Sequence, residues 1–395
     1  MAGGDHGIAA DAHASTRESS VEIKPFGVEM WMNEFETKCE LNLAETCVDS
    51  ITLAELLDMA GQRASVLEAL LPMRLGYGDI EGSPRLRAVI ASLYEKQARE
   101  NVLVCHGTIG ANALVHQALV SRGDHVIAVV PTYQQHYSIP ESIGAEVELL
   151  HLKAEQGYLP DLDTLKAMLR PSTKLIAINN PNNPTGALME RAMLEAIAGL
   201  ARSVGAWVLC DEVYRGTDQA GDGFTASMAD LYEKGISTAG MSKAYSLAGL
   251  RLGWIAAPKP VLEAAMIHRD YNTISVGRID DTLAALALEN RDKILARAHR
   301  ITRGNLAILA QWMDGEKKMR WVKPKSGTTA LLTYDLPISS RDFCIALLEE
   351  EGVMLCPGSA FDLEGTVRMG YACDTEVLQQ GLGRMSKFLA RKGNR

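Results

Sequence analysis

The feature that most constrains the fold is an alternation of short apolar segments with segments of helical periodicity. Residues 83–100 carry apolar side chains at helical spacing, whereas residues 101–105, 125–130, 174–178 and 207–210 are apolar at nearly every position. Strands of this kind are buried on both faces, which is typical of a mainly parallel sheet with helices on both sides. We therefore expect an α/β fold that binds its ligand at the carboxyl ends of the strands.

Composition excludes several classes of protein. The chain has 395 residues, enough for two domains, and its formal net charge of −9 argues against a nucleic-acid-binding protein. Its seven cysteines are widely spaced without a C-x-x-C pair, so we expect neither a disulfide framework nor a metal site. Free cysteines fit a cytoplasmic protein, and no apolar run is long enough to span a membrane.

The pattern also suggests how the chain is divided. Residues 1–22 are rich in Ala, Gly, Ser, His and Asp, and we interpret them as a disordered tail. Residues 23–60 are expected to form an N-terminal arm and part of a small domain. Residues 61–285 would form a large domain around the parallel sheet, and residues 286–395 a smaller α+β domain.

The strongest chemical signal lies in residues 240–254, which read Gly-Met-Ser-Lys-Ala-Tyr-Ser-Leu-Ala-Gly-Leu-Arg-Leu-Gly-Trp. Lys243 is expected on a turn among small and apolar residues, with Arg251 eight positions later. Burial and a nearby cation lower the pKa of such an amine, which favours a lysine that forms a Schiff base. Taken alone, a Ser-Lys pair is more often a solvent-facing lysine.

Two further motifs follow predicted strands. Residues 179–186 read Asn-Asn-Pro-Asn-Asn-Pro-Thr-Gly, a pattern that by itself indicates only a turn. Residues 211–214 read Asp-Glu-Val-Tyr and follow a buried strand. Asp211 could face a cationic ring nitrogen or could simply cap a helix. The shared position of these motifs at strand ends favours a common site.

In this order, the motifs N-x-P-x-N-P-T-G, D-E-x-Y and S-K-x-[FY]-x-x-x-G-x-R-x-G resemble those of the class I/II aminotransferases, which are fold-type I enzymes that use pyridoxal 5′-phosphate (PLP). The resemblance extends from about residue 23 to the C-terminus. It implies an aspartate aminotransferase-like fold, in which a large PLP-binding domain has a mainly parallel, seven-stranded sheet and a smaller α+β domain follows.

The resemblance implies three catalytic residues. Lys243 would form the internal aldimine and then move the α-proton of the substrate. Asp211 would pair with the pyridine nitrogen of PLP and keep it protonated, so that the ring acts as an electron sink. Tyr214 would hydrogen-bond the O3′ atom of the ring together with Asn183.

It also implies how the rest of the cofactor is held. Ser242 and Arg251 would bind the phosphate, and Tyr133 would stack on the pyridine ring. The segment Gly110-Ala111-Asn112 would open a helix whose backbone N–H groups face the phosphate.

Two more positions match the family. Tyr77, in Tyr-Gly-Asp-Ile-Glu-Gly, would reach the phosphate bound by a neighbouring subunit, which implies a homodimer. Arg368, in Val-Arg-Met-Gly-Tyr-Ala, would bind the α-carboxylate of an amino-acid substrate, with Asn183 beside it.

The sequence departs from the family at two places. Gly240 stands where many relatives have a phosphate-binding serine, a role that the hydroxyl of Thr238 or Thr108 could take over. Residues 43–45, Leu-Ala-Glu, are similar to 1-aminocyclopropane-1-carboxylate synthases, which act on S-adenosylmethionine. Glu45 could therefore pair with a cationic substrate group, although a capping or surface glutamate explains it as well.

Two enzyme functions remain open at this point. The first is an aminotransferase that acts on an L-amino acid by a ping-pong cycle. The alternative is a PLP-dependent lyase or replacement enzyme that acts on S-adenosylmethionine or another cationic amino acid in a biosynthetic pathway. A PLP-sensing transcription regulator is disfavoured because residues 1–22 leave no room for a basic DNA-binding domain. A nicotinamide dehydrogenase is disfavoured because residues 106–112 do not read G-x-G-x-x-G.

Overall fold

The computed structural model describes residues 22–392. The predicted tail lies outside the described residues except for its last residue, Glu22. Within the described range, no helix has an apolar stretch long enough to cross a membrane.

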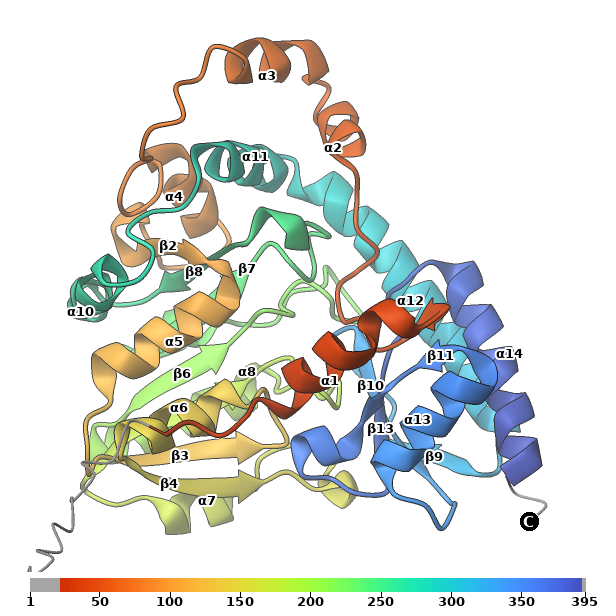
Figure 1. The fold of residues 1–395 in the computed structure, drawn as a ribbon. Helices are drawn as coiled ribbons and strands as arrows, with labels where there is room; N and C mark the ends of the chain where they lie inside the picture. The colour runs from red at the N-terminus through yellow and green to blue at the C-terminus, as the bar shows by residue number, and fades with distance from the viewer. Residues whose placement is uncertain (1–21, 393–395) are drawn as a thin grey trace, which may run out of the picture.

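A seven-stranded sheet forms the centre of the larger part of the molecule (Figure 1). Its strands are β2 (Val102–His106), β3 (His125–Val130), β4 (Glu146–His151), β5 (Thr173–Asn179), β6 (Trp207–Asp211), β7 (Gly235–Gly240) and β8 (Leu252–Ala256). They lie in the order β2-β8-β7-β6-β5-β3-β4, and β8 runs in the direction opposite to the other six strands. The predicted mainly parallel α/β fold is therefore confirmed.

Helices cover both faces of this sheet, which explains why its strands are apolar throughout. In β2, Leu103 and Cys105 pack in a core beneath α5 (Gly107–Leu119) and α10 (Lys259–Asp270), while Val102 and Val104 face the opposite core. Side chains alternate between the faces of a strand, so a strand between two helical layers needs apolar residues at both parities.

Further helices belong to the larger part and to its connection with the smaller part. They are α2 (Leu53–Ala60), α3 (Arg63–Leu70), α4 (Pro84–Ala91), α6 (Gln135–Ile143), α7 (Leu162–Met168), α8 (Arg191–Val204), α9 (Met228–Leu231), α11 (Arg278–Glu289) and α12 (Arg291–Gly315). Short 3-10 turns occur at Glu36–Lys38, Arg99–Asn101, Ala154–Gln156, Ala248–Leu250 and Gly358–Phe361. In Figure 1, α2 and α3 project beyond α11, and the long α12 leads toward the C-terminal elements.

One predicted helix is shorter than expected. Residues 83–100 were expected to be helical throughout, but α4 ends at Ala91. Beyond it, the buried carboxylate of Asp230 accepts the backbone N–H groups of Glu95 (2.9 Å) and Lys96 (2.9 Å). Because these donors bond a side chain, they do not continue the ladder of a helix.

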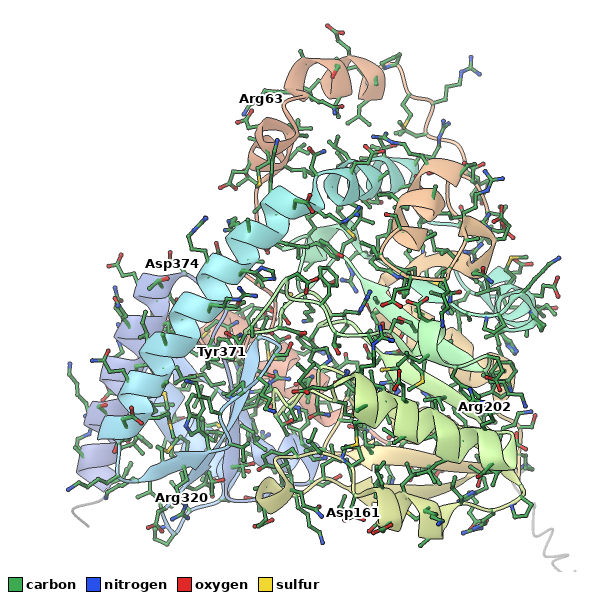
Figure 2. All side chains as sticks on the ribbon, turned by 180° about the vertical axis from the view of Figure 1, so that it is seen from behind. Arg63, Asp161, Arg202, Arg320, Tyr371 and Asp374 are labelled. Carbon is green, nitrogen blue, oxygen red and sulfur yellow. The ribbon has the colours of Figure 1, made fainter. Side chains whose placement is uncertain are left out.

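The smaller part combines both ends of the described chain. Its antiparallel sheet has the order β12-β13-β10-β9, formed by β9 (Met319–Trp321), β10 (Thr329–Tyr334), β12 (Cys356–Pro357) and β13 (Thr366–Gly370). Helices α13 (Ser340–Glu351) and α14 (Thr375–Lys392) pack with it. Figure 2 shows Tyr371, just after β13, beside α12, where Asn305 donates to its carbonyl oxygen at 2.8 Å.

The N-terminal segment joins this smaller part. Helix α1 (Gly27–Phe35) buries Val28, Trp31 and Phe35 in the core of the C-terminal elements, and β1 (Leu41–Asn42) pairs in parallel with β11 (Val353–Met354). The indole N–H of Trp31 donates to the carbonyl oxygen of Leu355 at 2.8 Å. Helix α1 consequently lies between the smaller part and the carboxyl edge of the large sheet (Figure 1).

Candidate active site

A cavity of about 330 Å³ lies at the carboxyl edge of the large sheet, closed on its other sides by α1, the segment after β1 and strand β13. Ten of the residues predicted from the sequence line it: Glu45, Asn112, Tyr133, Asn183, Asp211, Tyr214, Ser242, Lys243, Arg251 and Arg368. Three do not: Tyr77, Gly110 and Ala111. The loops that follow parallel strands all lie at the carboxyl edge of the sheet, so motifs far apart in the sequence meet there.

Lys243 lies on the turn after β7 with its amine in this cavity. Its Nζ donates to the hydroxyl of Thr46 at 2.5 Å and lies 3.5 Å from the sulfur of Cys47. Burial lowers the pKa of this amine, but Cys47, Tyr214 and Glu45 raise it and outweigh burial. The expected lowering of the Lys243 pKa is therefore wrong, because the groups that surround the amine are mainly acidic.

Asp211, the last residue of β6, presents a carboxylate that is only 3% exposed. Asn112 donates to its Oδ2 at 2.8 Å, and the backbone N–H of Val213 donates to its Oδ1 at 3.0 Å. The Nε2 of His136 lies 3.4 Å from Oδ2, and its Nδ1 lies 3.4 Å from the Nε2 of His116. These contacts fix the carboxylate where a protonated ring nitrogen could pair with it.

The start of α5 forms an anion-binding cradle in the same cavity. Because α5 begins at Gly107, the backbone N–H groups of Gly107, Thr108 and Ile109 have no acceptor within the helix. The hydroxyl of Thr108 is buried without a hydrogen-bond partner. Arg251 lies against this helix start, since a Cβ on Gly107 would be 3.0 Å from its Nη2. With Ser242 beside them, these groups fit a phosphate.

The predicted helix start at Gly110, Ala111 and Asn112 is wrong by about one turn of helix. Since α5 begins at Gly107, the backbone N–H groups of residues 110–112 lie inside the helix, where the preceding turn satisfies them. Asn112 contributes its side chain instead. The glycine that shapes the turn is Gly107, with φ of +65°, and not Gly110.

Gly240 stands where many relatives have a serine, and the side chain of Thr108 on α5 occupies the space beside it. A Cβ on Gly240 would lie 2.5 Å from the hydroxyl oxygen of Thr108. The other candidate, Thr238, donates its hydroxyl to Oδ1 of Asn112 at 2.5 Å and is therefore engaged. Thr108 is the hydroxyl positioned to replace that serine.

Arg368 lies on β13 and is 3% exposed. Its Nη1 donates to Oδ1 of Asn183 at 3.3 Å, and its Nη2 donates to the carbonyl oxygen of Ala44 at 3.0 Å. Its Nε is buried and has no hydrogen-bond partner. Arg368 also lines the cavity, and a buried guanidinium there is suited to bind a carboxylate.

Glu45 both caps a turn and faces the cavity, the two alternatives that the sequence left open. Its Oε1 accepts the backbone N–H groups of Thr46 (2.6 Å) and Cys47 (2.8 Å), so it caps a turn, and it also lines the cavity. Burial raises the pKa of Glu45, but the charge of Lys243 and these hydrogen bonds together lower it by a larger amount. The net shift is downward, so the cavity wall carries an ionised carboxylate.

Sequence reasoning missed the contribution of α1. Glu29 accepts a hydrogen bond from the hydroxyl of Tyr133 at 2.6 Å, and the ring of Phe26 packs 4.6 Å from the Tyr133 ring. Glu36 also lines the cavity. No motif marks these residues, and 104 positions separate Glu29 from Tyr133, so only packing brings them together.

Tyr77 is 79% exposed and lies away from the cavity of its own chain. Its contact with a neighbouring subunit stays a prediction.

Comparison with known proteins agrees with this geometry. A PLP-dependent aminotransferase from Streptococcus suis is 42% identical, with a TM-score of 0.91 over 94% of this chain and 99% of that one. Capreomycidine synthase from Streptomyces vinaceus is 29% identical over 365 residues, covering 92% of this chain and 93% of the relative. The PLP-dependent cyclase OrfR is 27% identical, with a TM-score of 0.87 over 96% of this chain and 100% of that one.

The model of the family "Aminotransferase class I and II" matches residues 47–385, which include every predicted catalytic residue. This match covers most of the chain, and the solved relatives use pyridoxal phosphate, for which the cavity has a fitting set of side chains. The chain belongs to the class I and II aminotransferase family and is a PLP-dependent enzyme.

Proposed function

We propose that this enzyme transfers the amino group of an L-amino acid to a 2-oxo acid. The observation that carries the proposal is the convergence of Lys243, Asp211 and Arg368 in one cavity. Lys243 supplies an amine that can move a proton, and the guanidinium of Arg368, which lines the same cavity, would bind an α-carboxylate. Both side chains line the cavity, so an amino acid held by Arg368 would share that space with the Lys243 amine.

The same residues indicate how PLP would be held. Asp211 would pair with the ring nitrogen, and Asn183 and Tyr214 would contact the ring hydroxyl. Thr108, Ser242 and Arg251 would bind the phosphate at the start of α5, and Tyr133 would cover the ring. When bound, the cofactor supplies an electron sink for the α-carbon of the substrate.

The chain itself controls the proton that Lys243 moves. The hydroxyl of Thr46 holds Nζ at 2.5 Å, and a hydrogen bond from Thr328 to the carbonyl oxygen of Thr46 at 2.6 Å fixes that residue. A free Lys243 amine therefore has a defined position in the cavity, which favours proton transfer to one face of the α-carbon.

A panel of amino acids mixed with the holoenzyme tests the proposal. Transamination predicts that each accepted amino acid becomes its 2-oxo acid and that the absorbance of the bound cofactor changes until an acceptor 2-oxo acid is added. Lys243→Ala should abolish this conversion while the protein still binds PLP. A holoenzyme that makes no 2-oxo acid from any member of the panel would refute transamination.

A second candidate is an elimination or replacement reaction on an amino acid with a cationic side chain, S-adenosylmethionine among them. It is favoured by the ionised carboxylate of Glu45 in the cavity wall and by similarity to capreomycidine synthase and the cyclase OrfR along nearly the whole chain. Release of a side-chain fragment, or a cyclic product that keeps its nitrogen, would distinguish it. Glu45→Gln with unchanged KM and products would remove Glu45 from either scheme.

We further propose a cytoplasmic homodimer in which Tyr77 reaches the neighbouring active site. Support comes from the exposure of Leu71 (85%), Leu75 (77%) and Tyr77 (79%) on one connecting segment, and from seven cysteines without a disulfide. Light scattering of the purified protein should give twice the mass of the chain. Tyr77→Phe should weaken PLP binding if the contact exists.

A further inference from the structure

Three carboxylates face the same cavity: Glu29 on α1, Glu36 at the start of the following 3-10 turn, and Glu45 after β1. None of them forms an ion pair with any Lys, Arg or His side chain in residues 22–392. Burial raises the pKa of Glu36, and the charges of Glu45 and Glu29 raise it further. The charge of Lys243 lowers the pKa of Glu45, whereas Glu29 and Glu36 have no ion-pair partner in residues 22–392, so a ligand cation would stabilise them.

The cavity wall opposite these carboxylates carries the positive charge of Arg368. Arg368 is 3% exposed, lines the same cavity, and has an Nε with no hydrogen-bond partner. This side of the cavity therefore carries a buried positive charge that suits an anionic ligand group. A ligand that satisfies both walls has a carboxylate at one end and a positive charge at the other.

Helix α1 also presents apolar side chains to the cavity. Val28, Glu29, Met32 and Glu36 all line the cavity, and their spacing places them on one face of the helix and its extension. Val28 and Met32 can contact a methylene chain, while the carboxylates meet its charged end. Basic side chains combine these two properties, since an aliphatic stem carries the ammonium or guanidinium.

We propose that Glu29 and Glu36 determine specificity by binding the distal guanidinium or ammonium group of a basic L-amino acid, whose α-carboxylate is bound by Arg368. This inference rests on the proposed function and names the substrate class of that site. One oxygen of Glu29 accepts from the Tyr133 hydroxyl, and its other oxygen has no hydrogen-bond donor within residues 22–392. That second oxygen is available to the substrate cation.

Substrate pairs that differ in charge but hardly in shape test the proposal: L-arginine against L-citrulline, and L-lysine against L-norleucine. The variants are Glu29→Gln, Glu36→Gln and the double variant. Glutamine at position 29 keeps an oxygen that accepts from Tyr133, so the charge changes while that contact can persist. Glu34→Gln is the matched control, because Glu34 lies on the same helix, outside the cavity, in an exposed pair with Arg341 at 3.2 Å.

The wild-type enzyme should have a kcat/KM for arginine at least about tenfold above that for citrulline, since a hydrogen bond to a charged group contributes about one to two powers of ten. The double variant should lose about tenfold or more of that preference, and the Glu34→Gln control should keep it. The lysine–norleucine pair should respond alike. A preference near one in the wild type, or an unchanged preference in the double variant, would overturn the inference.

Calorimetric binding to the holoenzyme separates this inference from the proposed reaction. If no amino acid yields a 2-oxo acid, transamination is wrong, but tighter binding of arginine than of citrulline that depends on Glu29 and Glu36 still supports the subsite. Equal binding of the two amino acids, or equal loss of both in the variants, contradicts it. The absorbance of bound PLP in each variant verifies that the cofactor site is intact.

Discussion

The clearest quantitative prediction concerns Asn112, which the sequence placed at the phosphate and the structure places beside Asp211. Its amide donates to the buried Asp211 carboxylate at 2.8 Å and accepts from Thr238 at 2.5 Å. Asn112→Ala removes a hydrogen bond to a charged group, which contributes about 1.5–3 kcal/mol. If Asp211 pairs with the ring nitrogen of PLP, the apparent Kd for PLP should rise about 10- to 100-fold.

The measurement is a titration of the apoenzyme with PLP, followed by cofactor absorbance. Thr238→Val removes only the outer hydrogen bond, so it should weaken PLP binding less than Asn112→Ala. Gln117→Ala is the matched control, because Gln117 is exposed on the same helix. Thermal unfolding of the apoenzymes separates a loss of cofactor affinity from a general loss of stability.

The refuting result is specific. If Asn112→Ala binds PLP within about twofold of the wild type, Asp211 does not depend on this amide for its orientation. The network through His136 and the backbone N–H of Val213 would then be sufficient by itself.

Three other predictions follow from single positions. Gly253→Ala would place a Cβ against the backbone of Gly107 at the start of α5, so PLP affinity should fall in the same titration. Gly370→Ala would collide with the carbonyl oxygen of Glu45, and urea unfolding should show a loss of about 1–3 kcal/mol. Burial raises the pKa of Asp218 to about 6, so the folded state binds its proton more tightly than the unfolded state does. Protonated Asp218 therefore contributes to the unfolding free energy near pH 4, and this contribution is lost as the pH rises through about 6. Asp218→Asn should exceed the wild type in unfolding free energy by about 2–3 kcal/mol at pH 7.5 and not at pH 4, and a gain independent of pH would contradict this.

Much of the fold was predictable because its signals are local. Strands β3, β5 and β6 are apolar at both parities, which indicates burial between two helical layers wherever they lie in the sheet. The helix expected over residues 83–100 was too long, because the bonds from Glu95 and Lys96 to Asp230 join positions about 135 residues apart.

The predicted cofactor-site residues came from motifs that directly follow strands. Asp211 and Lys243 reach the cavity because β6 and β7 are parallel neighbours, and residues just after such strands meet at one edge. The error at residues 110–112 has a local cause as well. Two glycines, Gly107 and Gly110, could each have opened the helix, and periodicity does not locate the first turn.

The sequence alone determined the parallel sheet, the family of the enzyme and the lysine that carries its chemistry. Each of these is indicated by short segments or motifs whose residues are close together along the chain. Only the tertiary structure decided what surrounds that lysine. The bonds from Tyr133 to Glu29 and from Arg368 to Ala44 span 104 and 324 positions, and they exist because α1 and β1 pack with the C-terminal elements. The charge of the cavity wall opposite Arg368, and with it the proposed choice of substrate, depends on that packing.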